Sequence, residues 1–281
     1  MNIFRVYFLA LLVSSGPLLA CTTSVDVPRM LSDWSNRQPV RGLEGEISMT
    51  EAECIRTEFQ QGLVVRAGKQ VGYKLGLTNA NVQKALGHDA PISGALMASM
   101  LLPDGSELPA QFGTRPLMEA DLLVEVADEG INEAQSPAEV IQHLSGVIPF
   151  IELPDLLVDP QVKINGARLV ALNVGARLGI VGKTLPASPA QLDALAAMTV
   201  VLTDENGKVL AQGHGSDILG HPLNAVIWLA KDLSRHGQRL KKGDLISLGS
   251  FNAPLKPLQG QSVTVSYQGL PGMGTASVRF K

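Results

Sequence analysis

Three acidic residues and one lysine form the most informative pattern in the chain. Glu119 and Asp121 are separated by one residue, and Glu152 follows further along. Lys74 precedes them, within the segment Gly-Tyr-Lys-Leu-Gly-Leu-Thr at 72–78. Carboxylate oxygens suit a hard divalent cation such as Mg²⁺ or Mn²⁺ better than zinc. A lysine beside such an ion can supply charge or move a proton. The pattern indicates metal-assisted chemistry on a small, oxygen-rich molecule.

The predicted strands decide whether these side chains can meet. Segments 71–77, 118–127 and 147–153 have the apolar content of β-strands. Side chains at positions i and i+2 of a strand point to the same face, so Glu119 and Asp121 project together. A side chain from the separate strand at 147–153 could then close the site.

Each acidic residue also has a plainer interpretation. Acidic side chains are mostly exposed, so Glu119, Asp121 and Glu125 could form the solvent-facing side of an amphipathic strand, with the apolar residues between them directed inward. Lys74 lies between two glycines, which allow close backbone approach. It is either a surface charge or a pocket residue.

The remaining elements indicate the fold class. We expect helices at 51–66, capped by Thr50, after Ser136–Pro137 and at 222–234. Further strands are expected at 170–181, in a hairpin of 198–203 with 208–212, and at 245–248, 262–267 and 276–280. Strands outnumber helices and alternate with them in groups, so the sequence predicts an α+β fold with a mixed, curved sheet.

Composition excludes some functions. The chain has 281 residues, of which 45% are apolar and 17% charged, which is typical of a globular protein. Its formal net charge is −3 and aromatic residues make up 4%. Both values argue against nucleic-acid binding, which needs a basic surface and stacking side chains.

The first residues predict export. Arg5 and the apolar run 6–13 resemble a signal peptide, and Leu-Leu-Ala-Cys at 18–21 resembles the lipobox of bacterial lipoproteins. The resemblance implies a signal peptide at 1–20 and lipidation of Cys21. The protein would then be periplasmic and attached to the membrane through its lipid only. Thr22 resembles signals that direct such proteins to the outer membrane. The alternative is an ordinary secretory signal with a chance cysteine.

Two consequences follow for the residues after the signal. Residues 21–41 are expected to form a polar tether. If Cys21 carries lipid, Cys54 is expected to be a buried, inert thiol outside any disulfide.

Several ordered motifs resemble one known family. The lysine segment 72–78, Gly-His-Asp-Ala-Pro at 87–91 and Met-Glu-Ala-Asp at 118–121 resemble motifs of the 2-keto-4-pentenoate hydratases and oxalocrotonate decarboxylases, within the fumarylacetoacetate hydrolase superfamily. Pro-Phe-Ile-Glu at 149–152 and the segment 215–230 continue the resemblance. It covers nearly all of the chain after about residue 50.

The resemblance implies a fold and a mechanism. The fold would be a mixed β-roll with a helical N-terminal portion, here a hydratase-like domain at 42–281 that self-associates. The implied metal ligands of Mg²⁺ or Mn²⁺ are Glu119, Asp121 and Glu152. The implied acid/base residues are Lys74 and Asp89. The implied substrate-binding residues are Asn173, Ser216 and Gly249.

The implied reaction adds water to a 2-hydroxy-2,4-dienoate through a metal-stabilised enolate of a 2-oxo acid. Leu172, Gly175 and Leu248 replace polar residues of the family pattern, and lost polar groups change which substrate atoms can be bound. Three alternatives therefore stay open: decarboxylation of an oxalocrotonate-like acid, hydrolysis of an acylpyruvate, and a surface-tethered binding protein without turnover.

Overall fold

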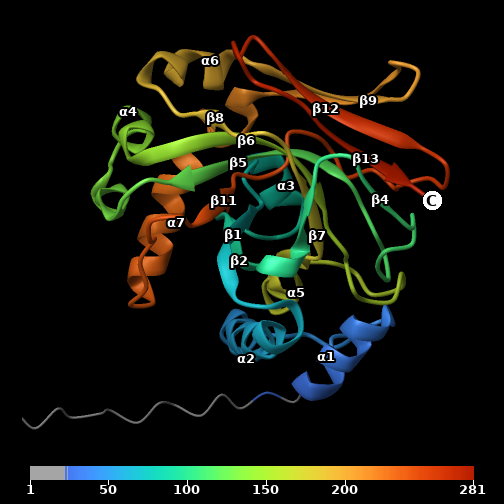
Figure 1. Cartoon of the computed structure of the whole chain (residues 1–281). Helices are drawn as coiled ribbons and strands as arrows, with labels where there is room; N and C mark the ends of the chain where they lie inside the picture. Colours follow the sequence, from blue (N-terminus) through green and yellow to red (C-terminus); the bar gives the residue numbers. More distant parts are fainter. Residues whose placement is uncertain (1–22, 24) are drawn as a thin grey trace, which may run out of the picture.

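The computed structural model describes residue 23 and residues 25–281. The predicted signal peptide and Cys21 lie outside these residues. The described chain combines helices with two sheets, which confirms the expected α+β class. Helices α1 (Val27–Asn36) and α2 (Met49–Ala67) lie together at one end of the molecule, and the smaller sheet lies at the other (Figure 1). None of the described helices is long and apolar enough to cross a membrane.

The larger sheet carries the candidate site. Its strands are β1 (Gln70–Gly76), β2 (Ile92–Met97), β3 (Leu101–Pro103), β5 (Glu119–Val126), β6 (Leu144–Leu153), β7 (Leu178–Val181), β8 (Leu185–Pro186) and β11 (Leu245–Ser247). Their order is β2-β1-β11-β5-β6-β7-β3, and β8 pairs with β6. The late strand β11 lies between the two early strands, parallel to β1 and antiparallel to β5.

The smaller sheet comprises β4 (Ser106–Leu108), β9 (Thr199–Asp204), β10 (Val209–His214), β12 (Ser262–Gln268) and β13 (Ala276–Phe280), in the order β10-β9-β12-β13-β4. β9 and β10 pair as the hairpin that the sequence predicts. This sheet stacks on β5 and β6 through the apolar face described below.

Short helices join the strands: α3 (Ala80–Ala85), α4 (Pro137–Val140), α5 (Gly166–Ala171), α6 (Leu192–Ala197) and α7 (Asn224–Arg235). α4 and α7 confirm two expected helices. The strand predicted over 170–181 is wrong in its first half. The Asn165 side chain accepts the backbone N–H of Arg168 at 2.9 Å and begins α5 there, so only β7 is extended.

The expected tether is also wrong. Residues 27–36 form α1, whose N-terminus is capped by the Asp26 side chain. Val27, Met30 and Leu31 are buried and pack in the same cluster as Phe59 of α2. An amphipathic stripe at helical spacing explains why this polar segment folds onto the domain.

Helix α2 differs from expectation in two details. The Ser48 hydroxyl, rather than Thr50, caps it by accepting the backbone N–H of Glu51 at 3.1 Å. Cys54 is half-buried and disulfide-bonded, so the expectation of a thiol outside any disulfide is wrong.

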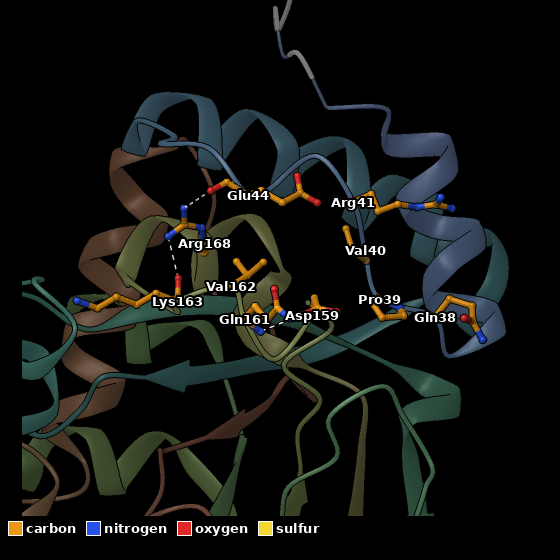
Figure 2. A pocket seen from close by; sticks show the side chains of 10 residues that line it. All are labelled: Gln38, Pro39, Val40, Arg41, Glu44, Asp159, Gln161, Val162, Lys163 and Arg168. Carbon is orange, nitrogen blue, oxygen red and sulfur yellow. Dashed lines mark hydrogen bonds between the residues drawn. The ribbon is translucent and has the colours of Figure 1, made fainter.

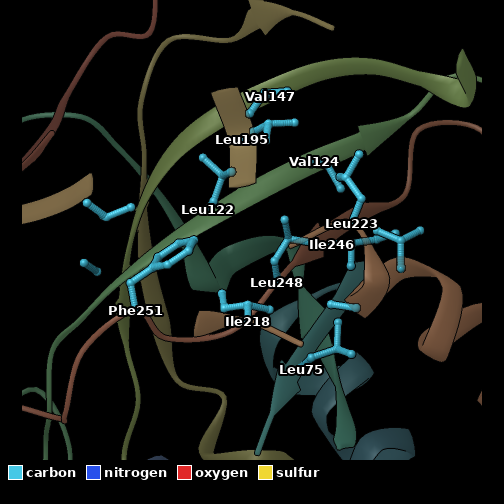
Figure 3. Close-up of a cluster of buried hydrophobic side chains, with 14 of the residues drawn as sticks. Leu75, Leu122, Val124, Val147, Leu195, Ile218, Leu223, Ile246, Leu248 and Phe251 are labelled. Atoms are coloured by element: carbon cyan, nitrogen blue, oxygen red, sulfur yellow. The ribbon is translucent and has the colours of Figure 1, made fainter. Parts of the chain in front are cut away.

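Both faces of the larger sheet are buried. On one face Leu75, Leu122, Val124, Ile246 and Leu248 converge with residues of α7 and the smaller sheet (Figure 3). On the other face Leu123 and Ile148 pack with residues of α2 and α5. Because side chains alternate along β5, Glu119 and Asp121 lie on the same face as Leu123. The acidic residues therefore project between the sheet and the N-terminal helices.

Candidate active site

Lys74 is a buried residue in the middle of the larger sheet. It is 3% exposed, its Nζ donates to the backbone oxygen of Val174 at 2.9 Å, and it forms an ion pair with Glu152. The glycines beside it explain the burial. A Cβ on Gly72 would lie 1.9 Å from the backbone oxygen of Leu245, and one on Gly76 would lie 2.6 Å from Val174 Cγ1. Only glycine lets β11 and the 173–175 turn cover the lysine, so Lys74 is the pocket residue and not the surface charge.

Glu119 and Glu152 face each other across the β5–β6 pair. They are direct partners in the strand register, so both side chains lie on one face. Glu152 is 2% exposed, and its Oε1 has no hydrogen-bond partner apart from the Lys74 ion pair. Burial, followed by the charge of Glu152, raises the pKa of Glu119 well above its usual value. Two carboxylates this close need a shared proton or a cation.

Asp121 lies two residues after Glu119 on β5 and is fully buried. Its Oδ1 accepts the backbone N–H of Leu122 at 2.6 Å and of Gly249 at 3.0 Å, and its Oδ2 accepts the Ser247 hydroxyl. Burial, followed by the charge of Glu152, raises the pKa of Asp121 to about 7. The expected solvent-facing strand face is therefore wrong for this residue.

The three carboxylates have different partners, although their charges act on one another. Asp121 turns toward β11, whereas Glu119 and Glu152 face each other. Among residues 23 and 25–281, no group of three or more His, Cys, Asp or Glu side chains has the arrangement of a metal site. The donor set near Lys74 is therefore two opposed glutamates, with an aspartate beside them that is already hydrogen-bonded.

Asn173 begins a left-handed turn over the lysine. Asn173, Val174 and Gly175 have φ values of 53°, 56° and 69°, so three successive residues occupy the left-handed region. The Asn173 side chain holds this turn to β2: its Nδ2 donates to the Ala95 oxygen at 2.9 Å, and its Oδ1 accepts the Ala95 N–H at 2.7 Å. Gln60 of α2 also donates to that oxygen, at 2.7 Å. In this structure the amide predicted to bind substrate instead aims the Val174 oxygen at Lys74.

The other predicted site residues lie around the end of β1. Asp89 is exposed, in the loop between α3 and β2. Ser216 is exposed too, in a turn whose neighbour Leu219 donates to the Thr78 oxygen at 3.1 Å. Gly249 lies closest to the carboxylates, because its N–H donates to Asp121. A Cβ on Gly249, whose φ is 112°, would lie 2.2 Å from Thr78 Oγ1.

The family departures lie in apolar clusters or against backbone. Leu172 is fully buried in the apolar cluster next to α5, and Leu248 packs in the opposite cluster with Leu122. Gly175 approaches backbone, since a Cβ there would lie 3.0 Å from the Asp155 oxygen. Apolar packing therefore accounts for both leucines.

Two functional neighbours escaped the sequence analysis. Ser247 is fully buried and its hydroxyl donates to Asp121. Tyr267 of β12 accepts the Phe150 N–H at 3.0 Å and donates to the backbone oxygen of Asp121, which ties the smaller sheet to β5 and β6. Ser247 precedes Leu248 by one position, so strand alternation could have identified it as the polar residue on the site face.

Two cavities lie elsewhere. The larger, of about 850 Å³, is lined by residues of 38–44 and 159–168 (Figure 2). In its wall the Arg168 guanidinium donates to the backbone oxygens of residues 43, 44, 45 and 163 at 2.7 to 3.1 Å. Arg168 therefore fixes segment 43–45 on α5. The other cavity, of about 590 Å³, includes Arg115 and Lys256 in its lining. Neither contains Lys74 or the glutamates.

The chain resembles proteins of known activity. No protein-family model matches it. It is 30% identical over 236 residues to a 4-oxalocrotonate decarboxylase of Pseudomonas putida, covering 84% of this chain and 86% of that protein. It is 31% identical over 244 residues to a 2-keto-4-pentenoate hydratase of Paraburkholderia xenovorans, covering 86% of this chain and 88% of that protein. The chain belongs to this hydratase and decarboxylase family.

Solved structures agree with the family assignment. A Pseudomonas putida 4-oxalocrotonate decarboxylase in complex with magnesium and adipate has a TM-score of 0.80 at 28% identity, covering 91% of this chain and 95% of that chain. A fumarylpyruvate hydrolase of Pseudomonas aeruginosa, in complex with Mn²⁺ and pyruvate, has a TM-score of 0.55 at 18% identity, covering 74% of this chain and 88% of that chain. The second comparison shows the shared fold alone.

Proposed function

We propose that this family member is a divalent-metal-dependent hydratase that adds water to a 2-hydroxy-2,4-dienoate and yields a 4-hydroxy-2-oxo acid. The observation that carries the proposal is the buried Lys74, paired with Glu152 and placed on the same sheet face as Glu119. Membership of the hydratase and decarboxylase family supports metal-dependent chemistry on a small 2-oxo acid.

The charges of the site fit a divalent cation. Two buried carboxylates, of Asp121 and Glu152, and the half-buried Glu119 lie on the sheet face that carries one buried ammonium, an excess of negative charge that burial makes costly. Glu152, whose Oε1 is held by the Lys74 ammonium alone, and the opposed Glu119 are the residues that would hold Mg²⁺ or Mn²⁺. When bound, the ion supplies positive charge opposite the substrate oxygen that becomes negative during the reaction.

Lys74 orients the substrate and the glutamate. Its ammonium has three donors, of which one reaches Val174 and one Glu152. The third remains for a substrate carboxylate or for proton transfer. Because the lysine is fixed from two sides and shielded from water, its charge acts at a defined position.

Other residues complete the proposed site. Gly249 and Thr78 form a close-packed wall at the end of β1 where a substrate tail would lie. Asp89 and Ser216, on exposed loops, are proposed as an acid/base residue and a substrate contact that approach when substrate binds. Asn173 contributes by aiming the Val174 oxygen rather than by direct contact.

Decarboxylation of a 4-oxalocrotonate-like acid is the second candidate, because a relative with that activity matches the chain as well as the hydratases do. Hydrolysis of an acylpyruvate needs a base to activate water. His221 does not serve, because one ring nitrogen lies 3.0 Å from the Leu192 oxygen and the other accepts the Leu223 N–H.

The test compares turnover of 2-hydroxypenta-2,4-dienoate and 4-oxalocrotonate by the purified protein with Mg²⁺ or Mn²⁺. We expect absorbance loss with the first compound, abolished in Glu152→Gln and kept in Glu125→Gln, a matched change on the same sheet. Carbon dioxide release from the second compound alone would favour the decarboxylase. Binding of 2-oxo acids without turnover would favour a tethered binding protein.

We also propose that the protein is a lipoprotein, exported and anchored by lipid at Cys21, on the evidence of the 18–21 motif. The chain has two cysteines, so a lipid on the Cys21 thiol and a disulfide of Cys54 within one chain exclude each other, and the mass of the N-terminal peptide decides between them. Membrane fractionation of wild type and Cys21→Ser, with mass spectrometry of the N-terminal peptide, tests this. Release of the variant and a lipid mass on Cys21 are expected. An unmodified Cys21, or a product that retains Met1, contradicts it. Self-association and outer-membrane localisation stay predictions.

A further inference from the structure

We propose that Gln60 of α2 is a positioning residue for the proposed reaction, and that it holds Lys74 in place through the turn at 173–175. The inference rests on the proposed function, in which the Lys74 ammonium acts on the substrate. It makes helix α2 part of the structure that orients this lysine, without direct contact between Gln60 and the substrate.

The first observation is that three hydrogen bonds hold the Asn173 side-chain amide in one orientation. Its Oδ1 accepts Gln60 Nε2 at 2.7 Å and the Ala95 N–H at 2.7 Å, and its Nδ2 donates to the Ala95 oxygen at 2.9 Å. An amide oxygen has two lone pairs, so Gln60 and Ala95 together fill them. Rotation of the amide by half a turn would direct its NH₂ group at both donors. Gln60 therefore fixes this orientation together with β2.

The second observation is that the turn after Asn173 needs such support. Val174 has a φ of 56°, in the left-handed region that β-branched residues rarely adopt. A conformation of this kind persists only where the surrounding structure imposes it. Asn173 directly precedes Val174, and its side chain links the turn to β2 and to α2. A loosened Asn173 side chain would therefore let the backbone at Val174 relax.

The third observation is that the turn contacts Lys74 directly. The Val174 oxygen accepts the Lys74 ammonium at 2.9 Å. A Cβ on Gly76 would lie 2.6 Å from Val174 Cγ1, and one on Gly94 would lie 2.4 Å from the Asn173 oxygen. The turn thus packs closely against the backbone of β1 and β2, and packing this close transmits small displacements. A shift of the Val174 oxygen would move one of the two groups that fix the ammonium.

The attachment of α2 to the domain does not depend on Gln60. Phe59 and Leu63 are fully buried in the cluster that joins α2 to the larger sheet. One turn before Gln60, the Arg56 Nη1 donates to the backbone oxygen of Ser93 on β2 at 3.0 Å. Gln60 itself is only half-buried. Loss of its amide should therefore leave the helix in place and loosen the turn.

Steady-state kinetics with 2-hydroxypenta-2,4-dienoate and Mg²⁺ test the positioning role. Gln60→Met keeps a long, helix-favouring side chain and removes the donor, so kcat should fall about tenfold while KM changes less than about twofold. Gln60→Lys supplies a new donor and should recover most of kcat. Gln61→Met, at the exposed neighbouring position, should leave both constants unchanged. An unchanged kcat in Gln60→Met, or an equal loss in Gln61→Met, overturns the inference.

A spectroscopic measurement gives an answer that does not depend on turnover. In protein labelled with ¹⁵N-lysine, the Nζ signal of Lys74 is identified by its absence in Lys74→Arg. We expect this signal to shift in Gln60→Met and to keep its position in Gln61→Met and in Arg56→Met. Arg56→Met removes another bond from α2 to β2, so it should lower the melting temperature about as much as Gln60→Met.

The Lys74 signal separates positioning from stability and from function. An equal shift in Arg56→Met and Gln60→Met would show that the signal follows the stability of α2, and it overturns the inference, as does an unshifted signal in Gln60→Met. If the wild-type protein turns over no 2-oxo acid, but the Lys74 signal shifts in Gln60→Met alone, the proposed function fails and the link from α2 to Lys74 stands.

Discussion

Replacing Lys74 with methionine should reveal how much of the fold depends on the buried ion pair. Methionine keeps most of the apolar stem and removes the ammonium. The Lys74 and Glu152 side chains are 4% and 3% exposed, and breaking so buried a pair leaves an uncompensated charge that costs about 3–5 kcal/mol. The Val174 oxygen also loses its donor, at about 1 kcal/mol or more. We therefore expect a loss of about 4–6 kcal/mol in the free energy of unfolding.

Urea denaturation followed by circular dichroism, in buffer with a chelator, measures this loss. The double variant Lys74→Met/Glu152→Gln should lose less stability than the two single variants added together, by about 2 kcal/mol or more, because it leaves no unpaired charge. Arg239 and Glu133 supply the control: they form an ion pair at 2.7 Å with side chains 56% and 75% exposed, so Arg239→Ala should cost less than about 1 kcal/mol. Additive single effects, or a Lys74→Met cost no larger than this control, would refute the reasoning.

Three further predictions concern the larger sheet and the residues packed on it. Because burial raises the pKa of Asp121 from 3.8 to about 7, the folded protein holds a proton that the unfolded chain releases. As the pH rises from about 4 to 7, the free energy of unfolding of the metal-free protein should therefore decrease, by up to about 4 kcal/mol from this group. Thermal melts in chelator at about pH 5 and pH 8 test this. Equal stability at the two pH values contradicts it. Gly72→Ala should cost about 3 kcal/mol in urea denaturation because its Cβ would meet the Leu245 oxygen, whereas Gly45→Ala, with no atom within 4 Å, should be nearly neutral. Leu172→Asp should destabilise by about 4 kcal/mol or more and should not raise turnover, since the carboxylate would enter an apolar cluster; an active variant with an unchanged melting temperature disproves this.

The sequence predicts those features of the site that depend only on neighbouring residues in the chain. Strand alternation placed Glu119 and Asp121 on one face, and the glycines around Lys74 indicated close backbone approach. Both features are local consequences of extended backbone and glycine geometry, so they could be inferred without the fold.

Long-range pairing could not be inferred in the same way. That Glu119 meets Glu152, while Asp121 is taken by Ser247, depends on which strands lie beside β5. Leu172 and Leu248 were interpreted as pocket residues from their place in a motif. Their side chains instead pack in the two apolar clusters, and a motif alone does not show the direction of a side chain. A short polar segment such as 27–36 also becomes helical only because α2 offers a surface for it.

The position of β11 has a consequence for how the protein reaches its native state. β1 and β5 do not pair with each other, because β11 lies between them, and β11 comes more than two-thirds of the way along the chain. Until that strand is inserted, Lys74 and Asp121 sit on separate sheet fragments with two exposed edges. Such late, non-local pairing slows folding and leaves edges open to aggregation. The charged centre is thus among the last parts to assemble, and a nascent or truncated chain ending before β11 would present aggregation-prone edges instead of a working site.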